Sequence, residues 1–223
     1  MTGGVTLVTG ASGAIGGAVA QRLRRDGRHV VTLGHSADAD VVVEFTDDDA
    51  LEAAVASVGP LAVLALCHGY LEPTPTPELS VERFRAMIEI NLMSMYTIIR
   101  SAIRSLPDGS AIVIVSSTAA FDHSPVGGPH YTVSKHGLNG LVRHLADELG
   151  GRGIRINSVN PGLIDNPMGR MFLTPEQYEA DARALPLKRA GRNDEVASVV
   201  SFLLSDESSY VTGAHIPVSG GLQ

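Results

Sequence analysis

Short runs rich in valine and isoleucine alternate along the whole chain with stretches in which apolar residues recur at helical spacing. Each run is brief and is bounded by Gly, Pro, Asp or Ser, which is the pattern of a buried strand. Strands that alternate with helices form parallel sheets, because each strand returns to the sheet through a right-handed crossover. The predicted strands are residues 5–9, 29–33, 41–45, 61–67, 111–116, 154–159 and 215–218, and the predicted helices are 15–25, 47–58, 81–104, 131–149 and 194–204.

This alternation predicts an α/β protein with one Rossmann-like, doubly wound parallel β-sheet flanked by helices on both faces. We expect a single domain over residues 1–223, because no repeat or linker interrupts the pattern. The second and third strands are separated by too few residues for a crossover helix, so that connection is expected to be an irregular loop. The proline-containing segment 163–186 follows a strand end and is expected to form a lid over a site.

Charge and cysteine content narrow the class of partner. The chain has 17 Lys and Arg against 24 Asp and Glu, a formal net charge of −7, which disfavours binding to nucleic acid or to an anionic membrane. No apolar run approaches the ~20 residues of a membrane span. Cys67 is the single cysteine, which favours a reducing compartment. We therefore expect a cytoplasmic protein with a small-molecule partner.

The first predicted strand runs directly into a glycine-rich turn, Thr9-Gly-Ala-Ser-Gly-Ala-Ile-Gly16, and then into a helix. Glycine makes such a turn tight and lets its backbone approach a pyrophosphate, while the helix amino terminus offers free N–H groups to that anion. A turn whose glycines serve packing alone is the alternative. The strand before it and the helix after it favour a dinucleotide site.

The end of the second strand bears on which cofactor is bound. An acid at this position would bind the ribose 2′-hydroxyl of NAD, whereas a basic residue favours the 2′-phosphate of NADP. His35 and Ser36 end the strand, and no acid precedes Asp38, so NADP(H) is favoured over NAD(H). The phosphate-binding charge is then expected from His35 or from elsewhere. Glu44, after the third strand, either faces the adenine amino group or is a solvated acid.

Tyr131 and Lys135 open a predicted helix, and their spacing of four places both side chains on one face. A lysine ammonium beside a phenol lowers the pKa of the phenol, as a general acid/base for an alcohol and a ketone requires. Such pairs also occur on solvated helices. Here, however, a buried strand precedes the pair and ends in Ser116 and Ser117 at the edge of the sheet where ligands bind. Ser117 there can donate a hydrogen bond to a substrate oxygen.

Together these motifs resemble the short-chain dehydrogenase/reductase family over essentially the whole chain. Further similar segments are Ile90-Asn91-Leu92, Asn157-Ser-Val-Asn-Pro-Gly162 and Tyr210-Val-Thr-Gly-Ala-His-Ile-Pro-Val-Ser-Gly-Gly221. The resemblance implies that Tyr131 is the catalytic acid/base and that Ser117 orients the substrate carbonyl. It implies that Lys135 holds the nicotinamide ribose and lowers the tyrosine pKa, while Asn91 holds a water in a proton relay. It also implies a homotetramer or homodimer, with helices 81–104 and 131–149 paired across a two-fold axis.

The candidate catalytic residues are therefore Asn91, Ser117, Tyr131 and Lys135. The histidines lack metal-ligand spacing, so no metal site is expected. Candidate cofactor-binding residues, several of them implied by the resemblance, are Gly10, Ser12, Gly13, Ala14, Ile15, Gly16, His35, Ser36, Glu44, Phe45, Gly69, Tyr131, Lys135, Pro161, Gly162 and Ile164.

The chain departs from the family pattern at several positions. Ala14 replaces the middle glycine of the turn, and Cys67-His68-Gly69 replaces Asn-Ala-Gly. His68 is expected to be a hydrogen-bonded structural histidine, with a catalytic role as the alternative, and Cys67 a small hydrophobe. Asn166 stands where a threonine often bonds the nicotinamide carboxamide. Thr118 is the alternative to Ser117, and residues Asp122, His123 and His130 either line the substrate pocket or lie in solvated loops.

These observations predict an NAD(P)-dependent oxidoreductase that transfers a hydride between nicotinamide and a ketone or secondary alcohol of a small metabolite. Two other functions stay open from the sequence. One is a redox-neutral isomerase or dehydratase that keeps its nucleotide, and the other is a catalytically silent nucleotide-sensing or scaffold protein. No Gly-x-Ser-x-Gly elbow of an acyl hydrolase is present.

Overall fold

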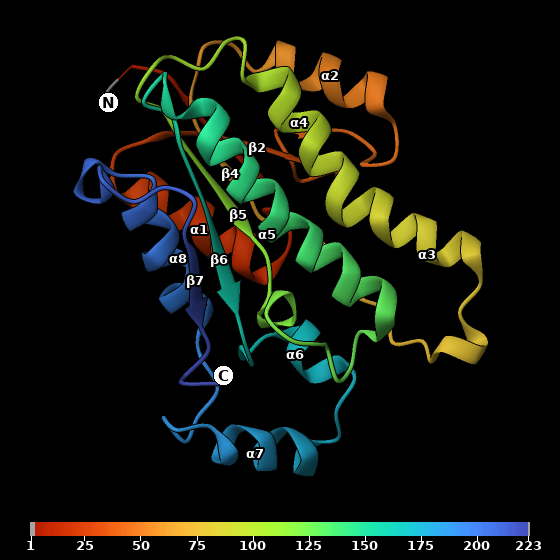
Figure 1. Ribbon diagram of the computed structural model, residues 1–223. Helices are drawn as coiled ribbons and strands as arrows, with labels where there is room; N and C mark the ends of the chain where they lie inside the picture. The colour runs from red at the N-terminus through yellow and green to blue at the C-terminus, as the bar shows by residue number, and fades with distance from the viewer. Residues whose placement is uncertain (1–2, 223) are drawn as a thin grey trace.

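The computed structural model describes residues 3–222, in which seven strands form one parallel sheet of order β3-β2-β1-β4-β5-β6-β7 (Figure 1). Every neighbouring pair is parallel, as burial beneath helices on both faces favours. The predicted doubly wound α/β fold is confirmed. The strands are β1 (Val5–Thr9), β2 (His29–Gly34), β3 (Val41–Val42), β4 (Leu61–Leu66), β5 (Ala111–Val115), β6 (Arg155–Pro161) and β7 (His215–Val218).

Helices cover both faces of this sheet. On one face α1 (Ala14–Arg25) packs against α8 (Asn193–Leu203), and on the other α2 (Asp48–Ser57) packs against α4 (Ser94–Ala102) beside α5 (Gly128–Gly150). α3 (Val81–Ile88) runs into α4 and packs on α5 (Figure 1). β1, β4, β5 and β6 are buried along their whole length. Their branched side chains therefore contribute to a hydrophobic core on each side of the sheet.

The connection between β2 and β3 contains no helix among the described residues, as expected from its length. The Asp40 carboxylate closes it by accepting hydrogen bonds from the Thr32 N–H and hydroxyl, both at 2.8 Å. The prediction that the third strand extends over 41–45 was wrong, because pairing stops at Val42. The chain then turns into α2, whose amino terminus the Asp47 side chain caps by accepting from the Ala50 N–H at 3.0 Å.

The predicted helix 81–104 is also not continuous. A π-helical turn, Glu89–Met93, separates α3 from α4, and α4 ends at Ala102. A π turn inserts one residue into the helical repeat and often marks a functional position. The turn contains Asn91, which is fully buried. The helix that carries Tyr131 starts earlier than expected, at Gly128, with Pro129 in its first turn.

Both edge strands of the sheet are restricted. β3 has only two residues. The Ala214 carbonyl, just before β7, and the Val218 carbonyl accept hydrogen bonds from the N–H groups of Ser158 and Gly162 on the β6 side. The alternate residue Pro217, which is exposed, therefore faces the free edge.

The segment 163–186 folds into two short helices beyond the carboxyl end of β6 (Figure 1), α6 (Pro167–Met171) and α7 (Pro175–Ala184). Asn166 caps α6, and Thr174 with Gln177 forms a capping box on α7. Neither these helices nor any other in residues 3–222 is both long and apolar enough to cross a bilayer.

Candidate active site

The predicted site residues follow the carboxyl ends of several strands, which parallel pairing brings to one edge of the sheet. The glycine-rich turn follows β1, His35 follows β2, Gly69 lies after β4 and Ser117 after β5. Pro161 ends β6, with Gly162 directly after it. The fold therefore places the candidate cofactor-binding and catalytic residues along one edge.

The glycine-rich turn is tight enough to require its glycines. Gly10 has φ +67, and a methyl group on Gly16 would lie 2.2 Å from the Gly10 carbonyl oxygen. No side chain caps the amino terminus of α1, and its first turn contains no acid. The first-turn N–H groups at Ala14 and Ile15 are thus left for an anion such as a pyrophosphate. The turn fits a dinucleotide, and alanine at position 14 causes no crowding, because this residue is exposed.

A small hollow of about 170 Å³ lies between this turn and the β2–β3 loop, with Ser12, Arg24 and Asp40 in its lining. Arg24 extends from α1 and lies 3.8 Å from the Asp40 carboxylate. Sequence reasoning missed Arg24 as a site residue, because only the fold brings the end of α1 beside the end of β2. His35 is exposed and Ser36 half-buried at the same strand end.

Phe45 is buried between two histidine rings on the same side of the site. Its ring makes an edge contact with His35, with centroids 6.4 Å apart, and stacks on His68, with centroids 4.0 Å apart. Glu44 is exposed at the turn into α2, which agrees with either expectation for it.

Ser117, Tyr131 and Lys135 meet where β5 ends against α5. The Ser117 side chain lies near enough to the Tyr131 hydroxyl to lower its pKa, and Lys135 Nζ lies 5.5 Å from the centre of the Tyr131 ring. Tyr131 is 8% exposed and Lys135 only 3%. The predicted helical spacing thus brings an acid/base pair together in a largely dry environment.

Burial determines the protonation of this pair. It raises the pKa of Tyr131, an effect that the Ser117 side chain opposes, and it lowers the pKa of Lys135 to about 8. The expectation that Lys135 brings the Tyr131 pKa towards neutrality does not hold in this arrangement. The ammonium lies over the ring, and desolvation of the phenol is the largest effect on its pKa.

The Asn91 side chain ties the loop after β4 to α5. Its Oδ1 accepts from the Tyr70 N–H at 2.7 Å, while its Nδ2 donates to the Tyr70 carbonyl at 2.8 Å and to the Ser134 hydroxyl at 3.2 Å. A methyl group on Gly69 would lie 3.3 Å from Lys135 Nζ and 3.7 Å from Asn91 Oδ1. Asn91, Gly69 and Lys135 therefore form one cluster beside Tyr131.

His68 is a structural histidine with hydrogen bonds at both ring nitrogens, as expected. Nδ1 lies 2.7 Å from Thr9 Oγ1 and Nε2 lies 2.8 Å from Ser94 Oγ. Burial lowers the pKa of His68 to about 3, so the imidazole is neutral at physiological pH. Burial also raises the pKa of the Cys67 thiol to about 12, which fits a small hydrophobe rather than a nucleophile.

The remaining candidates differ in their surroundings. Asp122 and His123 are exposed and pair with each other at 3.1 Å, which agrees with the solvated-loop alternative. His130 is fully buried, and neither ring nitrogen has a hydrogen-bond partner within residues 3–222. The Asn166 carbonyl oxygen caps α6 by accepting from the Gly169 N–H at 2.8 Å, so this oxygen serves the lid helix. Thr118 begins a short 3₁₀ turn, Thr118–Ala120, which the Ser117 hydroxyl caps.

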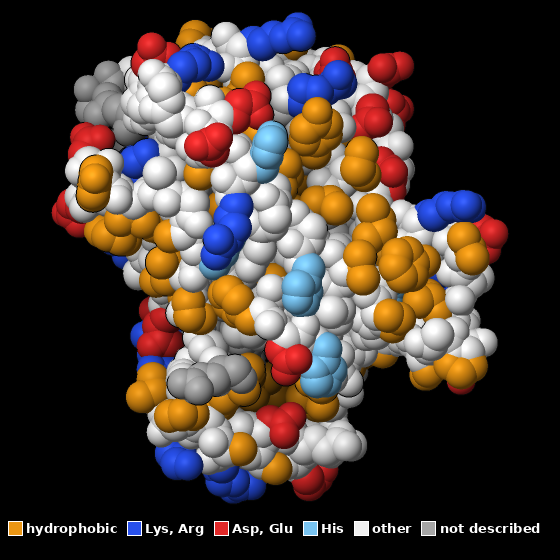
Figure 2. Space-filling view, viewed as in Figure 1, with side chains coloured by type: hydrophobic (Ala, Val, Ile, Leu, Met, Phe, Trp, Pro, Cys, Tyr) orange, Lys and Arg blue, Asp and Glu red, His pale blue; other side chains and the backbone are white. Residues whose placement is uncertain are grey.

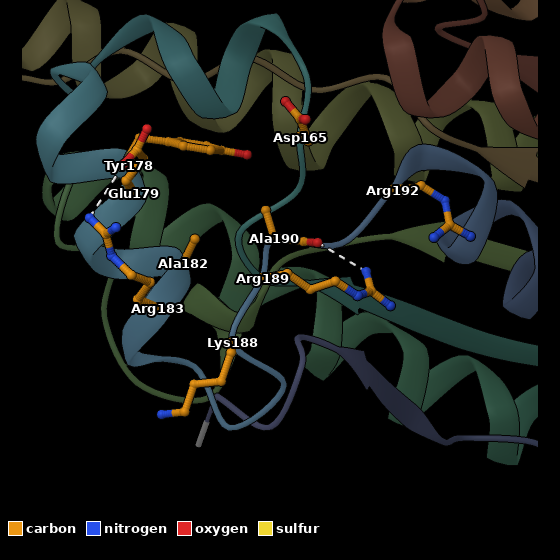
Figure 3. Close-up of a pocket in the computed structure, with 9 residues that line it drawn as sticks. All are labelled: Asp165, Tyr178, Glu179, Ala182, Arg183, Lys188, Arg189, Ala190 and Arg192. Carbon is orange, nitrogen blue, oxygen red and sulfur yellow. Dashed lines mark hydrogen bonds and ion pairs between the residues drawn. The ribbon is translucent and has the colours of Figure 1, made fainter.

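A pocket of about 400 Å³ lies between α7 and the segment 188–192 (Figure 3). The arginine side chains at this pocket form ion pairs with acids: Arg183 pairs with Glu179 at 3.3 Å and Arg189 with Glu195 at 2.6 Å. Arg189 and Arg192 extend away from α7 (Figure 3). Across the described part of the chain, no group of three or more His, Cys, Asp or Glu could hold a metal ion.

The chain is similar to known proteins in both sequence and fold. A family model described as enoyl-(acyl carrier protein) reductase matches residues 10–223. The chain is 33% identical to a glucose 1-dehydrogenase of Gluconobacter oxydans, over 97% of this chain and 90% of that protein. It is also 33% identical to a 3-oxoacyl-[acyl-carrier-protein] reductase of Rickettsia bellii, over 100% and 98%. A blue fluorescent protein from a metagenomic library, solved in complex with NADPH, superposes with a TM-score of 0.90 at 30% identity and covers 98% of this chain and 97% of its own.

Proposed function

Since the chain belongs to the short-chain dehydrogenase/reductase family and is an oxidoreductase acting on a carbonyl or alcohol group with a nicotinamide cofactor, we propose that it reduces a small carbonyl compound with NADPH and that Tyr131 is its proton donor. The observation that carries this proposal is the buried Tyr131 side chain, which lies beside Ser117 and Lys135 at the ligand-binding edge of the sheet. When bound, the cofactor supplies the hydride.

The protonation of the pair supports reduction at neutral pH. A phenol whose pKa is raised stays protonated, so Tyr131 can donate its proton to a substrate oxygen. Ser117 donates a second hydrogen bond to that oxygen and stabilises the charge that develops there. Lys135, with a pKa of about 8, is mostly protonated at pH 7 and close enough to neutrality to return a proton to Tyr131. Asn91 fixes the backbone beside Lys135 and belongs to this proton path.

The preference for NADPH rests on the lack of an acid directly after β2 and on Arg24, which lines the nearby hollow together with Asp38 and Asp40. No acid directly follows β2 to bind a ribose 2′-hydroxyl. Ser12 and Arg24 line the hollow beside that strand end, and an arginine suits a 2′-phosphate. The related blue fluorescent protein was solved with NADPH.

We assign the rest of the cofactor to residues along the same edge. The turn from Gly10 to Gly16 holds the pyrophosphate, Glu44 and Phe45 lie on the adenine side, and Gly69 lies beside the ribose. Lys135 holds the nicotinamide ribose, and Pro161, Gly162 and Ile164 line the nicotinamide. α6 and α7 form the lid over this end of the site, within one domain.

The related proteins indicate which carbonyl compounds to test first. Two relatives at 33% identity are named for glucose and for 3-oxoacyl-[acyl-carrier-protein]. We propose that the substrate is a small carbonyl compound of one of these two kinds. We also propose that the enzyme acts in the cytoplasm.

We also propose that the chain assembles as a homodimer or homotetramer through α4 and α5. Met93, Tyr96 and Val133 are apolar or aromatic yet 39%, 40% and 49% exposed. Figure 2 shows apolar side chains gathered over α3, α4 and the start of α5. Gly140, exposed on α5, leaves room for a second helix to approach.

The experiment is a titration of the protein with NADPH and, separately, with NADH, followed by nicotinamide fluorescence. We expect NADPH to bind at least about tenfold more tightly, and Arg24→Gln to weaken NADPH binding without changing NADH binding. Equal affinities for the two cofactors would overturn the NADP preference.

Turnover is then tested with NADPH and a 3-oxoacyl thioester and, in the opposite direction, with NADP⁺ and aldoses, with Tyr131→Phe as the control variant. We expect Tyr131→Phe to bind NADPH like the wild type and to lose about 10²–10⁴-fold in kcat. If the wild type binds NADPH but neither reduces the thioester nor oxidises the aldoses, the proposed substrate class is wrong. If Tyr131→Phe turns over normally, the proposed role of Tyr131 is wrong.

A further inference from the structure

A continuous series of hydrogen bonds runs through His68, a large residue that stands where the family pattern has alanine. Thr9 Oγ1, at the end of β1, lies 2.7 Å from His68 Nδ1 and accepts the Cys67 N–H at 3.0 Å. His68 Nε2 lies 2.8 Å from Ser94 Oγ, and that hydroxyl donates to the Ile90 carbonyl at 2.7 Å. The series therefore joins the ends of β1 and β4 to the π turn.

The two ends of the series determine the direction of every hydrogen bond within it. The Ser94 hydroxyl donates its hydrogen bond to the Ile90 carbonyl, so the Ser94 oxygen must accept a hydrogen bond from His68 Nε2–H. A neutral imidazole carries only one N–H, so Nδ1 has no proton and must accept a hydrogen bond from the Thr9 hydroxyl. The imidazole is thus the Nε2–H tautomer, and the Phe45 ring stacked on it at 4.0 Å fixes its plane.

The π turn needs this support for a local reason. Ile90 and Ser94 both lie at the turn, and a serine that bonds back to the carbonyl four residues earlier bends its helix. His68 holds Ser94 in that role and so holds the turn that carries Asn91. Asn91 in turn fixes the backbone of Tyr70 after β4, and Gly69, which directly precedes Tyr70, lies against the Lys135 ammonium.

We propose that His68 is a positioning residue for the proton path: through Ser94 and the π turn it holds Asn91 and Gly69 against Lys135. The proposal rests on the proposed function of Lys135. His68 touches neither substrate nor the reacting atoms in this account, and its contribution is the placement of the lysine environment.

The test uses the fact that the chain contains only two lysines, Lys135 and Lys188. Protein labelled with ¹³C at lysine Cε gives one signal for each, and Lys188→Arg assigns them. In the wild type we expect Lys135 to titrate near its pKa of about 8, with the exposed Lys188 as an internal reference. The measurement needs no substrate, so it is independent of whether the turnover assay succeeds.

The variants are His68→Ala and Ser94→Ala, which interrupt the series on either side of one hydrogen bond. We expect each to raise the Lys135 pKa by about one pH unit, because a loosened π turn admits water to the ammonium. The double variant is expected to show the same shift as either single variant, since both remove one connection. His68→Gln, which keeps a donor near Nε2, is expected to restore part of the wild-type titration.

Ile98→Val is the matched control, because Ile98 is fully buried in α4 near Ser94 but outside the series. We expect it to lower the thermal midpoint while leaving the Lys135 titration unchanged. If His68→Ala and Ser94→Ala lower the midpoint but leave Lys135 titrating as in the wild type, His68 is a structural residue only and the proposal is overturned. With a turnover assay in hand, the same variants should lower kcat about tenfold or more at an unchanged affinity for NADPH, and an unchanged kcat would also contradict the proposal.

Discussion

At the scale of single residues, the molecule keeps an ammonium group where its charge is costly. Lys135 is 3% exposed, and its pKa of about 8 lies below the ordinary 10.5. A depressed lysine pKa means that the unfolded chain binds the proton more tightly than the folded one. The charged lysine therefore destabilises the fold below pH 8, and this cost fades as the pH rises towards 10.5.

Lys135→Met tests this cost. We expect the variant to unfold at a higher urea concentration than the wild type at pH 7, with a smaller difference at pH 10, and to lose about 10²–10⁴-fold in kcat. Urea midpoints at both pH values measure the stability, and Lys188→Met, which changes an exposed lysine, should alter neither property. A Lys135→Met variant that is less stable than the wild type at pH 7 would show that the buried charge is fully compensated.

At the scale of helices and strands, α8 owes part of its stability to a carboxylate at its start. Glu195 accepts from the Arg192 N–H at 2.8 Å and pairs with Arg189. The hydrogen bond from Arg189, followed by that from the Arg192 backbone, lowers the pKa of Glu195 to about 2. A depressed carboxyl pKa gives a stabilisation that is complete above the ordinary value and is lost as the pH falls towards 2.

Glu195→Gln should therefore lower the urea midpoint at pH 7 and lower it less at pH 3. The effect is moderate, because Glu195 is 29% and Arg189 48% exposed. Glu176→Gln, at an exposed first-turn acid of α7, is the control and should be near neutral at both pH values. A Glu195→Gln deficit that is as large at pH 3 as at pH 7 would mean that the charge is not the source of the stabilisation.

Comparison of sequence and structure shows where local patterns suffice. The limits of β1 and β7 match the predicted 5–9 and 215–218, because Gly10 and Ser219 directly follow the two short runs and mark where they end. The prediction of a strand over 41–45 was wrong at its end, because the apolar ring of Phe45 packs on His68 and does not take part in strand pairing. Asn166-Pro167 and Thr174-Pro175 cap the starts of α6 and α7. These cap sequences predict both helices, but the prediction of a lid over 163–186 did not use them.

The candidate site divides in the same way. The spacing of four put Tyr131 and Lys135 together, and the strand end supplied Ser117. The π turn depends on the contact between His68 and Ser94, which are 26 residues apart, and helical periodicity carries no trace of such a contact. The same holds for Arg24, which reaches the end of β2 only in the folded chain.

At the scale of the whole molecule, the exposed apolar side chains on α4 and α5 predict self-association. Val133→Arg places a charge on this face, where burial of an unpaired charge is costly, and we expect it to shift the protein towards the monomer. Sedimentation velocity at matched concentrations measures the mass. Val42→Arg, at an equally apolar residue that is 59% exposed on the edge strand β3, is the control and should leave the mass unchanged. An unchanged mass for Val133→Arg would place the assembly on another face.

The two edge strands limit how copies of this chain can join. β3 offers only two residues of unpaired backbone, and Pro217 removes an N–H from the free side of β7. A foreign strand therefore finds little backbone to extend the sheet at either end. The folded protein is protected against edge-to-edge aggregation into fibrils, so a chain that aggregates must first expose the long central strands β4 to β6 by unfolding.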